Sequence, residues 1–181
     1  MQAAAILGQR GHEVHLYENQ KQLGGQWRIA CQMKGKGKYE TFLNHLSRIL
    51  HKTKVKVHLG VRVTSALVAK LKPDVLLLAT GATPRKLNIP GRGRKNIVQA
   101  NDVIMDRATI GLHVVVIGGR LLGMELAADL TEQGKKVSLI TRSSIGGQKK
   151  SFDQHIFNTL IKRLIQLRVP MYPNCSPIEV S

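Results

Sequence analysis

The alternation of apolar and polar residues is clearest between residues 114 and 142. Val114–Ile117 is a β-branched run, typical of a strand buried in a parallel sheet. Apolar residues then recur at helical spacing up to Gln133, and Gly134 marks the end of that helix. A second apolar run follows at Val137–Ile140. The segment therefore predicts a β-turn-α-β unit, in which a right-handed crossover joins two parallel strands.

Part of this unit recurs near the start of the chain, 123 positions earlier. The identical pairs are Ala4 and Ala127, Ala5 and Ala128, Leu7 and Leu130, Gly11 and Gly134, Val14 and Val137, and Leu16 and Leu139. Shortly afterwards, Leu23-Gly24-Gly25-Gln26 recurs as Ile145-Gly146-Gly147-Gln148. The repeat predicts that residues 1–18 are the second half of another such unit, whose first strand and glycine loop would precede Met1.

The remaining segments complete an α/β pattern. The spacing of apolar residues predicts helices over 39–51, 64–71, 100–107 and 152–168, and strands over 54–59, 74–79 and after Pro170. Residues 84–94, rich in Pro, Gly and basic side chains, are the expected linker. We therefore expect a Rossmann-like fold of parallel sheets flanked by helices, incomplete at both ends. Its domains would be 1–95, which lacks its first strand and glycine loop, and 96–181.

Composition narrows the class of partner and the compartment. Of the 181 residues, 28 are Lys or Arg and 11 are Asp or Glu, and the net charge of +17 favours anionic partners. Nucleic acid is disfavoured because no aromatic residues are interleaved with the basic clusters. The chain has no apolar stretch of membrane-spanning length and no secretory signal, and Cys31 and Cys175 lack disulfide or metal-ligand spacing. We expect a cytoplasmic protein with reduced thiols, no metal and no membrane contact.

The strongest chemical motif is Gly118-Gly119-Arg120-Leu121-Leu122-Gly123, which follows a strand and opens a helix. In dinucleotide-binding units the first glycine of such a motif permits the tight turn, the last permits close packing of helix on strand, and the helix N-terminus binds a pyrophosphate. Arg120 stands where the backbone must approach the pyrophosphate. Its side chain either fills that space or contacts the phosphate itself. A strand-helix turn that binds nothing is the simpler alternative.

Other candidate residues follow the strands. Glu18 ends the second strand of the first repeat, where a carboxylate accepts hydrogen bonds from the ribose hydroxyls of an adenine nucleotide. The corresponding residue of the second repeat is Thr141, and the following Arg142 and Ser143 suit a 2′-phosphate and hence NADP(H). Both charges are also compatible with a plain surface role. Thr80–Gly81 ends the run 74–79, and its small residues suit either a close approach to a cofactor or a simple loop.

These motifs together resemble the C-terminal nucleotide-binding portion of the NADH:flavin oxidoreductase group, which includes 2,4-dienoyl-CoA reductase, 2-enoate reductase and trimethylamine dehydrogenase. The resemblance is carried by residues 11–18, 23–26, 79–84 and 114–125. It implies that Glu18 holds the FAD adenosine ribose, that Gly24, Gly25 and Gln26 line the FAD site, and that Thr80 and Gly81 lie beside it. It also implies that Gly118, Gly119 and Gly123 cradle the pyrophosphate of NADP or NAD. On this resemblance, 1–95 is a partial FAD-binding domain and 96–181 a partial NAD(P)-binding domain.

The resemblance also implies a function. The chain is expected to be part of a flavoprotein oxidoreductase that passes electrons from NAD(P)H to FAD and, in the complete enzyme, to an enoyl-type or similar substrate. The catalytic barrel of that group is not represented here, so a partner chain or a missing segment would supply it, and no catalytic side chain is assigned. The alternatives are a non-catalytic nucleotide-binding fragment or assembly module, and charge-driven polyanion binding.

Overall fold

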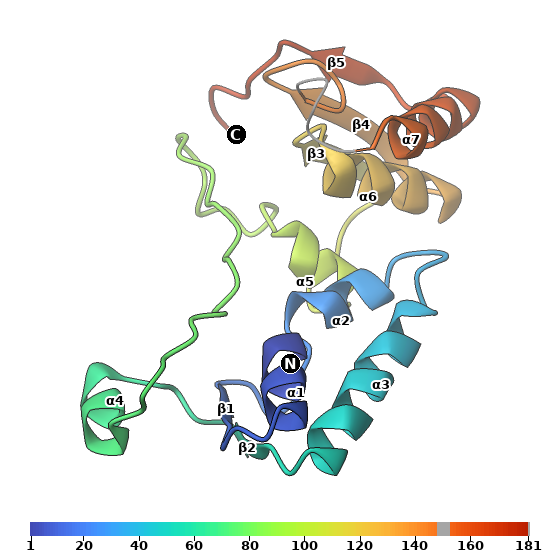
Figure 1. Ribbon diagram of the computed structural model, residues 1–181. Coiled ribbons are helices and arrows are strands. Elements are labelled where there is room, and N and C mark those ends of the chain that lie inside the picture. Colours follow the sequence, from blue (N-terminus) through green and yellow to red (C-terminus); the bar gives the residue numbers. More distant parts are fainter. Residues whose placement is uncertain (148–152, 181) are drawn as a thin grey trace. The chain divides into compact units, whose positions relative to one another are not determined.

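A computed structural model describes residues 1–147 and 153–180, and the chain divides into two compact units, Met1–Thr83 and Pro84–Ser181 (Figure 1). The division lies at the start of the expected linker 84–94, ahead of the expected boundary after residue 95. The segment 84–94 contains turns and no helix or strand. No helix among the described residues is long and apolar enough to cross a membrane.

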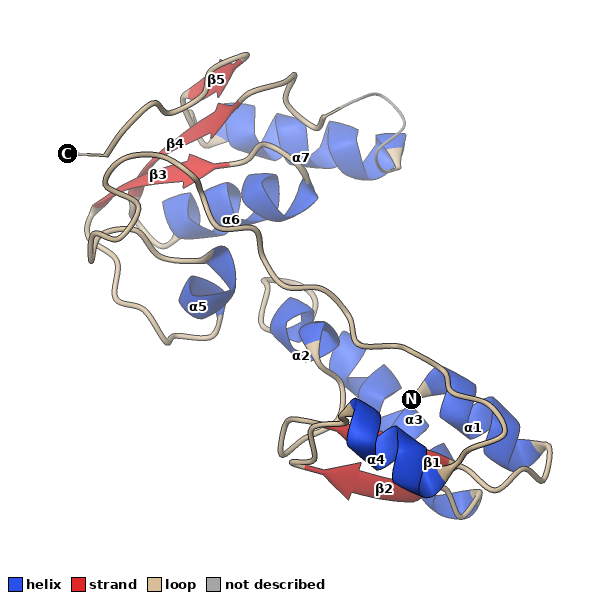
Figure 2. Ribbon diagram, turned by 90° about the vertical axis from the view of Figure 1, so that its left-hand side faces the viewer, coloured by secondary structure: helices blue, strands red, loops and turns tan. Residues whose placement is uncertain are grey.

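The second unit has the β-turn-α-β arrangement predicted for residues 114–142. Its elements are α5 (Ala100–Ile104), β3 (His113–Ile117), α6 (Leu121–Glu132), β4 (Lys136–Thr141), α7 (Gln154–Gln166) and β5 (Met171–Pro173). The strands form a parallel sheet in the order β3-β4-β5, with Val114 opposite Val137 and Leu139 opposite Met171. Figure 2 shows α6 and α7 lying along one face of this sheet. The predicted fold class is confirmed.

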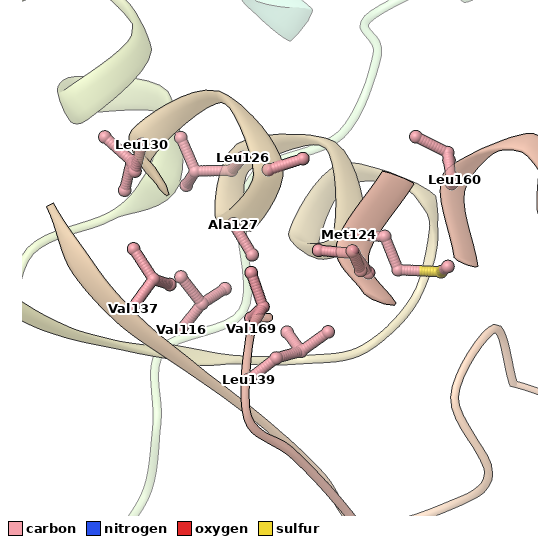
Figure 3. Close-up of a cluster of buried hydrophobic side chains, with 11 residues drawn as sticks. Val116, Met124, Leu126, Ala127, Leu130, Val137, Leu139, Leu160 and Val169 are labelled. Atoms are coloured by element: carbon pink, nitrogen blue, oxygen red, sulfur yellow. The ribbon is translucent and has the colours of Figure 1, made fainter. Parts of the chain in front are cut away.

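The core of the second unit lies between the sheet and these two helices (Figure 3). Along β4 the side chains of Val137, Leu139 and Thr141 are buried, as the two-residue period of a strand requires. Val137 and Leu139 belong to one cluster with Met124 and Ala127 of α6, both fully buried. On the opposite face of the sheet, Val115 of β3 is 57% exposed.

An ion-pair network joins α6 to α7. Arg163 of α7 donates from Nη2 to Asp129 Oδ1 at 2.7 Å and from Nε to Glu132 Oε1 at 2.8 Å. The hydrogen bond to Glu132, followed by the bond and charge of Asp129, raises the pKa of Arg163 above its ordinary value. Asp129 is buried, and the guanidinium of Arg163 places an opposite charge beside its carboxylate.

The first unit contains a shorter version of the same arrangement. Its elements are α1 (Gln2–Gln9), β1 (His15–Glu18), α2 (Gln26–Cys31), α3 (Tyr39–Lys52), β2 (Lys56–Leu59) and α4 (Ser65–Leu71). β1 and β2 pair in parallel, and Ala4, Ala5, Leu50 and Val55 form the core.

The structure reproduces the internal repeat. Gly11, which follows α1, has φ of 86°, and Gly134, which follows α6, has φ of 84°. Both glycines occupy the left-handed region that ends a helix at low steric cost, and each leads into a parallel strand. The repeated residues therefore specify the same helix-turn-strand geometry twice.

The main departures from the sequence predictions concern three segments. Residues 74–79 were expected to form a buried strand, but the segment has no regular structure, and Val75 and Leu78 are 74% and 79% exposed. The segment pairs with no strand of the described residues. The helix expected over 100–107 ends at Ile104. The helix expected from residue 152 starts at Gln154, where Asp153 caps it, and residue 152 lies outside the described part.

Candidate functional site

Two positions of the turn between β3 and α6 require glycine for steric reasons. Gly118 has φ of 122°, a conformation that side chains disfavour. A Cβ added to Gly123 would overlap the carbonyl oxygen of Gly118 and lie 2.9 Å from its carbonyl carbon. The last glycine therefore allows the first turn of α6 to rest directly on the backbone of the turn.

The same turn packs against the end of β4. Gly118 donates its N–H to the Ile140 carbonyl at 2.8 Å, and a Cβ on Gly119 would lie 2.8 Å from Thr141 Cγ2. The Gly119 carbonyl accepts a hydrogen bond from the N–H of Gly146 at 2.7 Å. The structure thus brings Gly118, Gly119 and Gly123 together with the end of β4 and the loop that follows it. Gln148, the last residue of the repeated motif, lies outside the described residues.

Arg142 and Ser143 open this loop. Arg142 is exposed and directly follows Thr141, the residue against which Gly119 packs. The loop is fixed to the segment after β5, because the carbonyl of Ser143 accepts from Asn174 N at 3.2 Å and that of Thr141 accepts from Cys175 N at 3.0 Å. The two residues selected from the sequence are therefore held at the carboxyl end of β4, beside the glycine turn.

Arg120 is the N-cap residue of α6. Its backbone angles, φ −88° and ψ −176°, are ordinary for a residue with a side chain, so arginine causes no backbone strain here. The residue is exposed, and its side chain makes no capping hydrogen bond to the first turn of α6. The N–H groups of a helix N-terminus and the positive end of its dipole favour an anion.

In the first unit, Glu18 lies at the carboxyl end of β1. Its Oε1 accepts a hydrogen bond from the N–H of Gln20 at 2.9 Å, and its carbonyl accepts from Val61 N at 3.0 Å. Both bonds hold the end of the strand in place. The second carboxylate oxygen has no hydrogen bond to another described residue.

The other candidates of the first unit form a separate group. Gly24 and Gly25 both have positive φ, and Gly25 is the N-cap of α2. The side chain of Gln26 donates from Nε2 to the carbonyl of Ala82, next to Thr80 and Gly81. The structure therefore joins the Gly24–Gln26 loop to the end of the 74–82 segment, a contact between residues far apart in the sequence that no local pattern indicated.

A hollow of about 440 Å³ lies at the opposite end of the second unit's sheet. It is lined by the start of β3 and β4, including His113 and Lys136, and by Arg168. Ligands of open parallel sheets bind outside the carboxyl ends of the strands. The glycine turn, and not this hollow, is therefore the candidate site.

Comparison with known proteins identifies the family. The sequence profile of the pyridine nucleotide-disulphide oxidoreductases matches residues 1–181. The chain belongs to this family. Membership of the pyridine nucleotide-disulphide oxidoreductases implies that the chain binds FAD and NAD(H). These cofactors agree with those expected from the sequence.

Individual relatives agree with the resemblance to the NADH:flavin oxidoreductase group. This oxidoreductase chain is 40% identical over 144 residues to an NADH oxidase of Thermoanaerobacter brockii, covering 77% of the chain and 22% of the relative. It is 34% identical over 140 residues to a cinnamate reductase of Clostridium sporogenes, covering 77% of the chain and 21% of the relative. The chain thus spans about a fifth of the length of these relatives.

Solved structures agree with the Rossmann-like fold. A 2-naphthoyl-CoA reductase in complex with 2-naphthoyl-CoA superimposes on this oxidoreductase chain with a TM-score of 0.88, at 22% sequence identity. The match covers 99% of the chain and 27% of the reductase. At this level of identity the similarity establishes the fold alone.

Proposed function

We propose that the second unit binds the pyridine nucleotide of a flavoprotein oxidoreductase and that the first unit binds the adenosine portion of FAD. The observation that supports this best is the contact of the Gly118–Gly119 turn with Thr141 at the uncapped N-terminus of α6. That arrangement presents backbone donors, a helix dipole and the end of a parallel strand at one place, as pyrophosphate binding requires.

NADP(H) is the nucleotide that the end of β4 favours. Thr141 is buried and uncharged, so no carboxylate at that position accepts hydrogen bonds from a ribose hydroxyl. The exposed guanidinium of Arg142 and the hydroxyl of Ser143 would face the 2′-phosphate instead. In this proposal Arg120 is a further cation at the pyrophosphate, since its backbone is relaxed and its side chain is exposed.

FAD would be held in the first unit by residues on two loops and one strand end. Glu18 retains an acceptor oxygen for a ribose hydroxyl. The loop Gly24-Gly25-Gln26 would lie along the dinucleotide. The hydrogen bond from Gln26 to Ala82 joins this loop to the segment that contains Thr80 and Gly81. The small residues and positive φ angles of these loops permit a close approach of backbone to ligand.

The chemistry of the complete protein would belong to its cofactors, with hydride transfer from NAD(P)H to flavin. The chain's own residues would bind and orient the two dinucleotides. An enoyl-type or similar substrate, and a further segment or partner that binds it, are proposed from the similarity to a cinnamate reductase. We place the protein in the cytoplasm, and the absence of a disulfide at Cys31 and Cys175 is compatible with that compartment.

The assignment of NADP(H) is tested by titrating the chain with NADPH and NADH in a calorimeter. Replacing Arg142 with Ala removes one charge-assisted contact, worth about 1.5–3 kcal/mol, so the NADPH affinity should fall at least about ten-fold while that for NADH is unchanged. Lys162→Ala, which removes an exposed cation of α7, is the matched control and should leave both affinities unchanged. Equal losses for the two nucleotides in Arg142→Ala would contradict the role of Arg142.

A further inference from the structure

Two histidine side chains from neighbouring strands meet on one face of the sheet of the first unit. β1 and β2 pair in parallel with Tyr17 opposite His58, and His15 lies two residues before Tyr17. Because the side chains of a strand alternate between the two faces of its sheet, these three residues share a face. The Nδ1 atom of His15 lies 3.2 Å from the Nε2 atom of His58. No spacing pattern predicted this pair, since 43 positions separate its members.

The separation of these two nitrogens suits two ligands of one metal ion. Imidazole nitrogens bind Zn²⁺ at about 2.0–2.1 Å, so two of them on one ion lie about 3.3–3.4 Å apart at a tetrahedral angle and about 2.8–3.0 Å apart at a right angle. The observed 3.2 Å lies between these values. Without an ion the two nitrogens share one proton, and rotation of each ring about its Cβ–Cγ bond turns its lone pair toward a shared ion.

A carboxylate contacts the second nitrogen of the His15 ring. The Nε2 atom of His15 lies 3.4 Å from Glu13 Oε1. Histidines that bind a metal usually donate their other ring N–H to a carboxylate, a carbonyl or water, which fixes the tautomer and the orientation of the ring. A proton on Nε2 of His15 leaves the lone pair on Nδ1, the nitrogen that faces His58. Lys56 holds the carboxylate in place by donating from Nζ to Glu13 Oε1 at 2.6 Å.

The surroundings of the pair support the second ring and leave the first accessible. Tyr17 stacks on His58, with ring centroids 4.4 Å apart and planes inclined by 11°. His15 is exposed and His58 is half-buried. Within residues 1–147 and 153–180, no group of three or more His, Cys, Asp and Glu residues is arranged to hold a metal ion. A site at this pair therefore has two protein ligands and leaves the remaining coordination positions to water.

We propose that His15 and His58 bind one divalent late-transition-metal ion, Cu²⁺, Ni²⁺ or Zn²⁺, and that Glu13 is the positioning residue of His15. Imidazole is a ligand suited to these metals, whereas Mg²⁺ and Ca²⁺ prefer oxygen ligands. The ion joins β1 to β2 and thereby holds the two strands together. The site uses none of the residues proposed to bind FAD or the pyridine nucleotide, so it is independent of the proposed function.

The test is a titration of the whole isotopically labelled chain with Zn²⁺, followed by the imidazole ¹⁵N resonances. Nδ1 of His15 and Nε2 of His58 should shift along one saturable curve that ends at one ion per chain. The rings of the other five histidines should not follow this curve, and Mg²⁺ should shift neither ring of the pair. No saturable shift at millimolar Zn²⁺, a shift of only one ring of the pair, or an equal response of all seven histidines would overturn the proposal.

Two variants test whether both rings bind the same ion. Loss of an outer partner of a metal ligand costs about 10–100-fold in affinity, so loss of a ligand itself, in His15→Asn or His58→Asn, should weaken Zn²⁺ binding at least about ten-fold. His45→Asn, which removes an exposed histidine of α3, is the matched control and should leave the affinity unchanged. Unchanged binding in either variant of the pair would overturn the proposal, and the spectra of the unmodified chain decide it should a variant not fold.

The role of Glu13 is tested by its two neutral replacements. Glu13→Ala should weaken Zn²⁺ binding about 10–100-fold, because the Nε2 proton of His15 loses its acceptor. Glu13→Gln is equally uncharged but keeps an oxygen acceptor, so it should recover part of that loss and keep the His15 proton on Nε2 in the ¹⁵N spectrum. Wild-type affinity in Glu13→Ala, or equal losses in the two variants, would show that Glu13 does not position His15.

Discussion

The contact between Gly123 and Gly118 makes a strong prediction about stability. In the variant Gly123→Ala, the added methyl group would overlap the carbonyl oxygen of Gly118, and roughly 1–2 Å of movement is needed to restore an ordinary contact. Neither side can move easily. The Gly118 N–H is bonded to Ile140, and α6 is fixed by the fully buried Met124 and Ala127.

The cost should lie at the upper end of the range for overpacked cores, about 3 kcal/mol. For a unit of this size that corresponds to a fall of about 12–24 °C in the melting temperature. Because the chain has two units, a single melting curve does not isolate the one affected. Hydrogen exchange of the β4 amides, read by mass spectrometry, reports on the second unit alone, and about 3 kcal/mol predicts exchange about 100-fold faster when it occurs by unfolding of the unit.

Gly111→Ala is the matched control. A Cβ at Gly111 meets no atom within 4 Å and the residue has no positive φ, so its effect should be at most about 1 kcal/mol, with stabilisation as the expected direction. If Gly123→Ala exchanges at the same rate as Gly111→Ala, the close packing of α6 on the glycine turn is wrong.

Three further predictions concern other contacts. Leu139→Ala, at a fully buried position of β4, should destabilise the second unit by about 3–5 kcal/mol in urea unfolding, and a loss below about 1 kcal/mol would contradict the described core. Arg163→Ala should destabilise the unit by about 2 kcal/mol by removing the charged hydrogen bond to the buried Asp129, and an Arg163→Ala, Asp129→Asn double variant should recover part of that loss, whereas no recovery would place the defect elsewhere. The hydrogen bond from Lys56 lowers the pKa of Glu13, so the pair contributes at neutral pH and its contribution is lost as the pH falls through that lowered value; in NMR titration Lys56→Ala should raise the Glu13 pKa, and an unchanged value would refute the contact.

The sequence was sufficient to predict the elements whose partners lie nearby in the chain. Three local patterns predicted structure correctly: the β-branched run at 114–117 a strand, the glycines 11 and 134 the ends of helices, and the apolar spacing of 39–51 a helix. The structure confirms all three. The repeat also located the ends of two strands correctly, at Glu18 and at its counterpart Thr141. The family and its cofactors followed from motifs that combine these local signals.

Contacts over long distances in the sequence were not predictable in this way. The run at 74–79 has the composition of a buried strand, but composition does not specify which edge is present to pair with it, and the segment is exposed. The bond from Gln26 to Ala82 joins residues 56 positions apart, and no periodicity encodes it. The relaxed backbone of Arg120 depends on the entry of the chain into α6, so the glycine pattern alone gave no information about strain there.

The central proposal is that the glycine turn of the second unit is the nucleotide site. The most direct test is titration of the isotopically labelled chain with NADPH, followed by the amide resonances of Gly118, Gly119 and Gly123. We expect these three resonances, together with those of Arg142 and Ser143, to shift along one saturable curve, while that of Gly134, which follows the opposite end of α6, does not move. Absence of any saturable shift at these five amides at millimolar NADPH and NADH would contradict the proposed function.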